Sequence, residues 1–328
     1  MSVAASLLIL LLHIALMLAT APLLLGVIRR IKARMVGRIG PSILQPWRDL
    51  LRLLKKQPVI ADGTSWLFRA APLVGLTATL TAAAMVPSFA LGMATAGISD
   101  LLVIAGLLAF GRATLALAAM DTGTAFGGIG ASREMTFSVF AEPVFFLIVF
   151  TLALIAGTTN LDAAASLIDS GVLGLRISMA LGLVAAITLA IAECGRIPVD
   201  NPAGHLELTM VHEAMVLEYS GRHLAMIELA ASLKLLLWMS LISVVFAPFG
   251  IAPHDGIGPS LAPWLWLLGI GAWAAKMLLL AAALALFETI QAKLRVFRVP
   301  ELLGMALLLG LLAVIFLFVS QGFAQGTP

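Results

Sequence analysis

Long uninterrupted runs of apolar residues alternate with short polar segments along the whole chain. A helix needs roughly 20 apolar residues to cross a bilayer, and about eight runs approach that length. They lie at residues 3–28, 67–91, 98–120, 135–157, 172–192, 224–248, 261–286 and 302–320. Because the runs are continuous rather than alternating, and isolated strands cannot satisfy their backbone in lipid, they predict helices. We therefore expect an all-α integral membrane protein, with residues 1–328 forming a single transmembrane domain of about eight helices.

Composition supports lipid as the solvent of this fold. Hydrophobic residues make up 61% of the 328 residues and charged residues only 11%, whereas soluble domains carry roughly 25% charged residues. The chain has one cysteine, Cys194, which cannot ligate an iron–sulfur cluster alone. We expect no metal or redox cofactor in this chain, so that any such group belongs to a partner.

Basic residues in the loops predict the topology. Eight spans place both termini on one side, and the loops at 29–66, 121–134, 193–223 and 287–301 on the other. These four loops hold fifteen Lys and Arg residues, and the three loops on the opposite side hold none. Because Lys and Arg concentrate in cytoplasmic loops, we expect the long loops in the cytoplasm and both termini outside.

The first cytoplasmic loop predicts a short amphipathic helix. From residue 47 to 56, apolar and basic residues separate onto two helical faces, a pattern suited to the membrane interface. One interpretation is a basic anchor that contacts anionic lipid, and the other is a docking surface for a cytoplasmic partner. The candidate docking residues of this loop are Arg38, Gly40, Pro41, Trp47, Arg48 and Asp49.

The second cytoplasmic loop is rich in glycine, which lets a backbone pack closely against a neighbouring surface. Its candidate docking residues are Asp121, Gly130, Arg133 and Glu134. Arg133 and Glu134 open the next expected helix, and Glu142 lies inside it. A carboxylate within the membrane is costly, so Glu142 is a functional candidate, with an ion pair to an arginine as the alternative.

The third cytoplasmic loop concentrates carboxylates. Like charges crowded near lipid raise one another's pKa, which suits proton exchange. Two prolines predict a folded turn, and residues 204–218 could form a helix near the membrane surface. The loop carboxylates, which we assign to a proton path, are Glu193, Asp200, Glu207, Glu213 and Glu218. The candidate docking residues of this loop are Arg196, Pro198 and Tyr219.

Further charges lie within or at the ends of the expected spans. Several such groups in one bundle can form a proton path, whereas isolated pairs would be structural. Glu228 and Lys234 are six residues apart, so each should meet a partner on another helix. His13 is expected to be a packed or lipid-interface residue instead. The charges assigned to the path here are Glu142, Glu228, Lys234, Lys276 and Glu288, and Arg112 shares this environment.

Motifs in these loops resemble one family of membrane subunits, shared by respiratory complex I and membrane-bound group 4 nickel–iron hydrogenases. The resemblance covers nearly the full length. It rests on Arg38-x-Gly40-Pro41, Gly130-Ala131-x-Arg133, Glu193-x-x-Arg196-x-Pro198-x-Asp200, Glu207-Leu208 and Glu218-Tyr219-Ser220-Gly221. Asp121-Thr122-Gly123 and Gln45-Pro46-Trp47-Arg48-Asp49 are similar to the formate hydrogenlyase and hydrogenase-4 branch.

This resemblance implies a subunit that is not catalytic alone. It would anchor a cytoplasmic arm of hydrogenase-like large and small subunits, which carry the nickel–iron and iron–sulfur centres, beside antiporter-like membrane subunits. The chain would link electron transfer to proton translocation in the plasma membrane of a bacterium or archaeon. Two alternatives stay open: a quinone-site subunit of complex I, and a stand-alone secondary transporter. No nucleic-acid partner is expected.

Overall fold

The structure is a computed structural model that describes residues 3–61, 63–169, 177–200, 211–255, 258–259, 263–292, 294 and 298–325. Within these ranges, seven helices are long and apolar enough to cross a membrane. They are α1 (Val3–Met35), α3 (Trp66–Met85), α4 (Leu101–Asp121), α5 (Ala125–Ala156), α9 (Gly221–Phe246), α10 (Pro263–Ile290) and α11 (Val299–Gln325). The predicted all-α membrane fold is confirmed.

The remaining expected span corresponds to α7 (Ile177–Glu193), a shorter apolar helix of 17 residues. At about 1.5 Å per residue it is roughly 25 Å long, slightly less than the hydrocarbon core. The first residues of the expected span, 172–176, lie outside the described part of the chain. Because α7 packs against α5, α9 and α11, it belongs to the same bundle as the longer helices.

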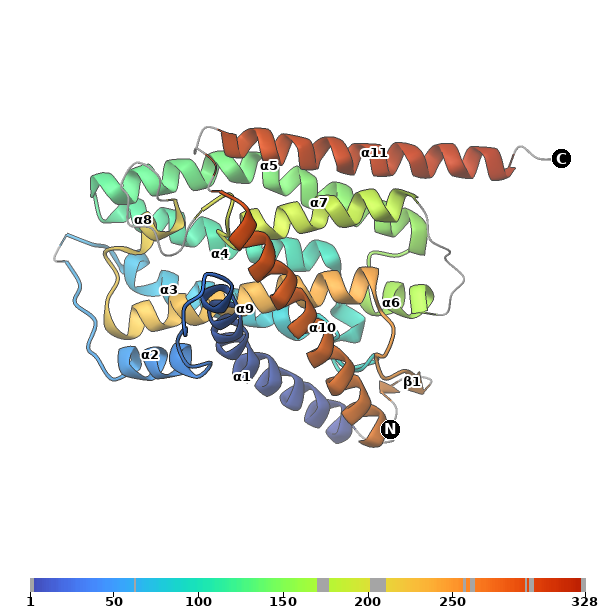
Figure 1. The fold of residues 1–328 in the computed structure, drawn as a ribbon, viewed down its shortest axis with the longest axis horizontal. Coiled ribbons are helices and arrows are strands. Elements are labelled where there is room, and N and C mark those ends of the chain that lie inside the picture. The colour runs from blue at the N-terminus through green and yellow to red at the C-terminus, as the bar shows by residue number, and fades with distance from the viewer. Residues whose placement is uncertain are drawn as a thin grey trace.

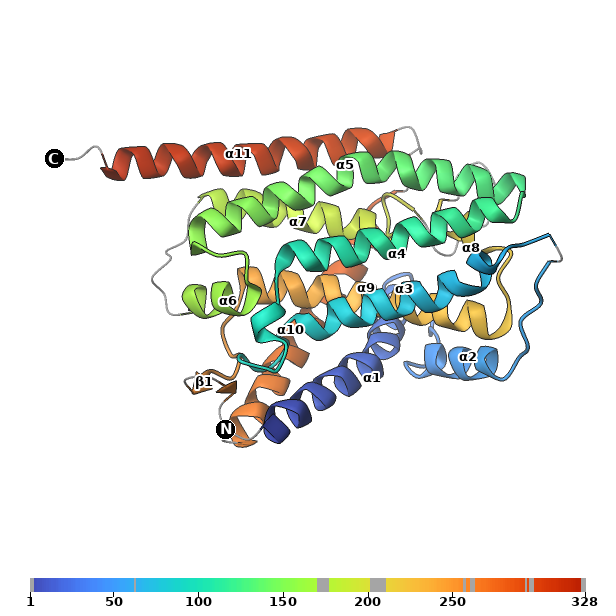
Figure 2. The ribbon, with the colours of Figure 1, turned by 180° about the vertical axis from the view of Figure 1, so that it is seen from behind.

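The long helices form one elongated bundle with two distinct ends (Figure 1). The start of α1 and the end of α11 lie at one end, with α6 (Leu161–Asp169) and the hairpin of β1 (His254–Asp255) and β2 (Gly258–Pro259). The view from behind shows α2 (Gln45–Leu54) and α8 (His212–Val216) at the opposite end (Figure 2). The start of α1 and the end of α11 therefore share one end, and α2 of the first loop and α8 of the third loop share the other.

The glycine-rich segment after α4 differs from the sequence-based expectation. A loop was expected over residues 121–134, but α5 begins at Ala125, and the Thr124 hydroxyl caps it by accepting from the Gly127 amide. A Cβ on Gly127 would lie 2.3 Å from the Ala119 carbonyl oxygen, and one on Gly130 would lie 3.0 Å from Ala214 Cβ. The glycines therefore permit close helix packing, which outweighs their low helix propensity.

The first loop holds the expected amphipathic helix, α2, packed against α1 and α9. Pro46 and Leu50 face the bundle, while Leu51 and Leu54 are exposed. The third loop contains only the short α8 within the described residues, so the helix expected over 204–218 is confirmed only from 212 to 216. As expected, His13 is packed inside the bundle and fully buried.

Candidate functional site

An arginine at the centre of the bundle connects two carboxylates from other helices. Arg112 is on α4, and its side chain is only 8% exposed. One guanidinium nitrogen donates to Glu193 at the end of α7, and the other donates to Glu142 of α5 over 3.2 Å. A charge inside a bundle is stable only when it is paired, so Arg112 fixes the positions of both carboxylates.

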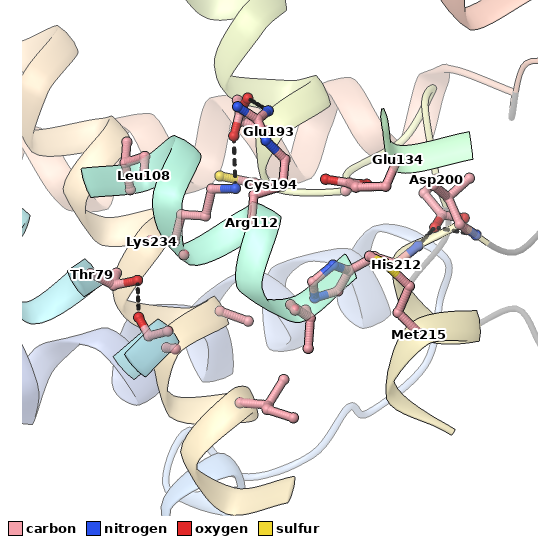
Figure 3. A pocket seen from close by; sticks show the side chains of 18 of the residues that line it. Thr79, Leu108, Arg112, Glu134, Glu193, Cys194, Asp200, His212, Met215 and Lys234 are labelled. Carbon is pink, nitrogen blue, oxygen red and sulfur yellow. Dashed lines mark hydrogen bonds and ion pairs between the residues drawn. The ribbon is translucent and has the colours of Figure 1, made fainter. Parts of the chain in front are cut away.

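Glu193 also pairs with a lysine on a fourth helix. Lys234 Nζ of α9 lies 2.7 Å from Glu193 Oε2, and the Glu193 side chain is 6% exposed. Figure 3 shows Glu193 between Arg112 and Lys234, joined to each by a dashed line. Glu142, Arg112, Glu193 and Lys234 form what we name the central charge network. Its two cations and two carboxylates balance, which lowers the cost of burying them.

The central charge network reaches the lateral surface of the chain at Glu142. The Glu142 side chain is 46% exposed, in contrast to the buried Arg112 and Glu193. A cavity of about 60 Å³ lies beside these three residues and is also lined by Gly106 of α4 and Trp238 of α9. The network therefore runs from the interior to the outer face of α4 and α5.

A second cavity, of about 110 Å³, lies between the central charge network and the third loop. Glu193 and Lys234 line it together with Glu134 of α5, Asp200 and His212 (Figure 3). The cavity thus joins buried charges of the bundle to polar residues of the loop, and such an arrangement can hold a polar ligand or conduct protons.

Asp200 organises the loop above this cavity. It is 3% exposed, and its Oδ2 accepts from the backbone amides of Val211 and His212 over 3.2 and 3.3 Å. These contacts hold the start of α8 against the end of the preceding turn. Asp200 therefore joins the turn after α7 to the start of α8. Glu207, a predicted site residue, lies outside the described residues.

A second set of buried charges begins three residues after Glu193. A guanidinium nitrogen of Arg196 lies 3.7 Å from Oε1 of Glu288 on α10. The ammonium group of Lys32 on α1 donates to Glu288 Oε2 over 2.7 Å. The Glu288 side chain is fully buried. Since Glu193 and Arg196 flank one turn of the third loop, a movement of that turn would affect both sets of ion pairs.

Tyr219 fixes the other end of the third loop to α3. Its ring stacks on Phe68 with centroids 4.1 Å apart, and its hydroxyl donates to the Phe68 carbonyl over 3.1 Å. In a regular helix that carbonyl would accept from the amide four residues later, but this position is Pro72, which has none. Burial, and then the nearby Asp121 carboxylate, raise the pKa of Tyr219, so its hydroxyl stays a donor.

The other predicted loop residues have structural contacts or surface positions. Asp121 accepts from the Ser65 amide at the start of α3 over 2.7 Å, and the Pro198 carbonyl accepts from the Leu294 amide over 2.9 Å.

In the first loop, the Trp47 indole donates to the Ala19 carbonyl of α1 over 3.1 Å. Gly40 has a φ of 75° that favours glycine. Three residues lie exposed at the surface: Arg38, Pro41 and Arg48.

Several predicted path residues lie away from the central charge network. Lys276 donates to the Ala247 and Phe249 carbonyls, so it caps the end of α9. Glu228 lines a cavity beneath α2 instead. Glu213 is partly buried and Glu218 is exposed.

The second-loop docking candidates lie close to the third loop or the cavity beneath it. Gly130 packs against α8, Glu134 lines the 110 Å³ cavity and Arg133 is partly buried.

Two residues of the site were not assigned to it from the sequence. Arg112 was recognised only as a charge in an apolar span, although that position is itself a signal of a buried partner. Lys32 carried no signal, because it stands in a run of basic residues that the topology already explains. Its pairing with Glu288 depends on α1 and α10 lying side by side, which is a tertiary property.

Comparison with known proteins gives one consistent family. A family model described as NADH dehydrogenase matches residues 7–319. Formate hydrogenlyase subunit 4 of Escherichia coli (strain K12) is 32% identical over 284 residues, covering 87% of this chain and 90% of that protein. Hydrogenase-4 component C of the same organism is 36% identical over 236 residues, covering 72% and 74%.

Two further similarities extend this picture. NADH-quinone oxidoreductase subunit 8 of Rhodothermus marinus is 29% identical over 250 residues, covering 73% of this chain and 72% of that protein. A chain in the structure of the membrane-bound sulfane sulfur reductase, an archaeal respiratory membrane complex, aligns with a TM-score of 0.75 at 20% identity. That alignment covers 94% of this chain and 99% of the other, and it shows that the two share a fold.

Proposed function

Because this chain belongs to the family described as NADH dehydrogenase, we propose that it is the membrane anchor and coupling subunit of a multisubunit, redox-driven complex. It docks a cytoplasmic arm of hydrogenase-like large and small subunits, which hold the nickel–iron and iron–sulfur centres. The identities of 32% and 36% with formate hydrogenlyase subunit 4 and hydrogenase-4 component C, against 29% with the Rhodothermus marinus subunit, favour this branch.

The observation that carries the coupling role is the central charge network. Glu193 ends α7 and leads directly into the third loop, so a shift of that loop would move Glu193 relative to Arg112 and Lys234. Arg112 is shared with Glu142, so the shift would also change how strongly Glu142 is paired. A change in pairing alters whether a carboxylate holds a proton, which would connect loop movement to proton transfer.

The exposure of Glu142 supports a membrane partner on the α4 and α5 face. A carboxylate that is 46% exposed on a spanning helix would be costly against hydrocarbon. An antiporter-like subunit that covers this face with polar groups would remove that cost and receive the proton. The third loop, at the end of the bundle with α2 and α8 (Figure 1), is the corresponding surface for the cytoplasmic arm.

A second candidate function is that of a quinone-site subunit, favoured by the 110 Å³ cavity under the third loop. Apolar groups such as Leu108 and Phe137 line it together with Asp200 and His212. Such a mixture suits a ring with polar substituents. This candidate function requires that a quinone analogue binds tightly to the purified complex. It also requires that a variant with a larger side chain at a lining residue binds the analogue less tightly.

Affinity purification of the tagged chain in mild detergent, followed by mass spectrometry, tests the proposal. Hydrogenase-like large and small subunits should copurify in amounts equal to the tagged chain. Copurification of NADH-oxidising subunits would instead establish the complex I alternative. Purification of the chain alone, with solute transport by the lone protein in vesicles, would establish the secondary transporter and refute both complexes.

A further inference from the structure

A cavity of about 160 Å³ lies beneath the amphipathic helix α2 and plays no part in the site above. It is lined by residues of α1, α2 and α9 and is partly open to the surface. Leu25 and Leu53 contribute apolar walls, while the charged residues are Arg29 of α1, Asp49 of α2 and Glu228 of α9. The cavity therefore offers one cationic and two anionic groups beside an apolar surface.

The cavity does not arise from a loosely attached helix. A Cβ on Gly26 of α1 would lie 2.1 Å from the carbonyl oxygen of Ile43, just before α2. At the other end, a Cβ on Gly221 of α9 would lie 2.5 Å from the carbonyl oxygen of Gln57, just after α2. Both ends of α2 are thus held in backbone contact with the bundle, so the space between them is a fixed part of the fold.

The charges around this cavity are available to a ligand. Among the described residues, neither Arg29 nor Glu228 forms an ion pair within 4 Å, although the two have opposite charges and line the same cavity. Asp49 accepts from Gln45 and is 3.6 Å from Arg52, but its side chain remains 41% exposed. A molecule carrying both an anionic and a cationic group would pair with all three lining charges.

The position of α2 identifies the class of molecule. Leu51 and Leu54 on α2 are 52% and 46% exposed, and Arg48 is also exposed. An amphipathic helix with exposed leucines beside basic residues lies at the boundary of headgroups and acyl chains. A phospholipid has both a charged headgroup and acyl chains, so its chemistry matches a cavity at this level with apolar walls at Leu25 and Leu53.

We propose that this cavity binds the headgroup of phosphatidylethanolamine. The phosphate pairs with Arg29, and the primary ammonium group donates hydrogen bonds to Glu228 and Asp49. A choline headgroup has no N–H to donate, and an anionic phospholipid without an amine would place its charge beside two carboxylates. The bound lipid would link α2 to α1 and α9, close to the predicted docking residues Trp47 and Arg48.

The lipid content of the purified complex tests this proposal. The intact complex is extracted through a tag on this chain, and the phosphatidylethanolamine that it retains is measured by mass spectrometry. Arg29→Gln and Glu228→Gln should each lower retention about tenfold, because each removes a charge-assisted contact. The matched controls Arg30→Gln and Glu301→Gln remove charges that do not line the cavity and should retain the wild-type amount.

Competition on the wild-type complex provides an independent measurement that needs no variant to fold. In nanodiscs of equal phosphatidylethanolamine, phosphatidylcholine and phosphatidylglycerol, the ethanolamine lipid should be retained preferentially. The proposal would be overturned if the choline lipid were retained equally or the glycerol lipid were preferred. It would also be overturned if Arg29→Gln and Glu228→Gln lost a bound quinone instead of a lipid. None of these readouts depends on hydrogenase activity or proton movement. The tagged chain carries the cavity whichever partners copurify with it, so failure of the proposed function would not decide this result.

Discussion

Lys234 Nζ and Glu193 Oε2 lie 2.7 Å apart, and the pair joins α9 to the end of α7 inside the bundle. Removing the shared carboxylate charge in Glu193→Gln would leave the two cations Lys234 and Arg112 with only the Glu142 carboxylate to balance them. Breaking a buried pair in this way costs about 3–5 kcal/mol. We expect the variant to melt at a lower temperature in detergent and to give a reduced yield of complex.

The double variant Glu193→Gln with Lys234→Met provides the control for this prediction. It removes one positive and one negative charge together, so the remaining Arg112 and Glu142 still balance. The double variant should be more stable than Glu193→Gln alone, and a double-mutant cycle of melting temperatures measures the coupling. Purely additive effects would contradict a direct energetic link between Glu193 and Lys234.

Glu142→Gln separates proton relay from structural pairing. The amide oxygen can still accept from Arg112, so we expect normal assembly, but the side chain can no longer bind and release a proton. Complex yield and proton uptake are measured on the same preparation, with Glu301→Gln as the control for losing a surface carboxylate. A low yield with normal coupling in the assembled fraction would indicate a structural pair, and normal values of both would refute both roles.

Tyr219→Phe keeps the ring that stacks on Phe68 but removes the hydroxyl donor. The Phe68 carbonyl would then lack both this donor and the helical amide that Pro72 cannot supply. An unsatisfied buried group costs about 1–3 kcal/mol. We expect lower thermal stability of the purified complex and unchanged membrane insertion.

The same interaction can be tested in a background where the helix has its own donor. In Pro72→Ala the residue at position 72 gains an amide that can donate to the Phe68 carbonyl. Tyr219→Phe should therefore be less destabilising in Pro72→Ala than in the natural sequence. An equal loss in both backgrounds would show that the hydroxyl contributes through another contact.

Cysteine labelling tests which end of the bundle faces the cytoplasm. Ser42→Cys and Ser170→Cys are placed in a Cys194→Ala background, so that each carries a single thiol. Because the loops of one side hold all fifteen loop Lys and Arg residues, a membrane-impermeant reagent added outside should label position 170 and not position 42. Outside labelling of position 42 would reverse the proposed orientation.

The sequence alone determined the fold class and the approximate spans. Burial in lipid demands long apolar helices, so each span is visible as a local run of apolar residues. The helix ends were less predictable: α3 ends at Met85 rather than near residue 91, and α5 begins at Ala125 rather than near residue 135. Those ends depend on caps and on close backbone packing at Gly127 and Gly130, which are contacts between segments.

The candidate site shows the same division. A charge in or beside an apolar span is energetically costly, so the sequence alone marks such residues as functional candidates. These residues were Glu142, Glu193 and Lys234. Only the tertiary structure decided that Glu142 and Glu193 share Arg112 and that Lys234 pairs with Glu193. It also decided that Lys276 caps α9 instead, and that Glu288 pairs with Lys32. Sequence spacing gives the face of one helix on which a charge lies, whereas pairing depends on how four separate helices pack, and that is set by the shape of the whole bundle.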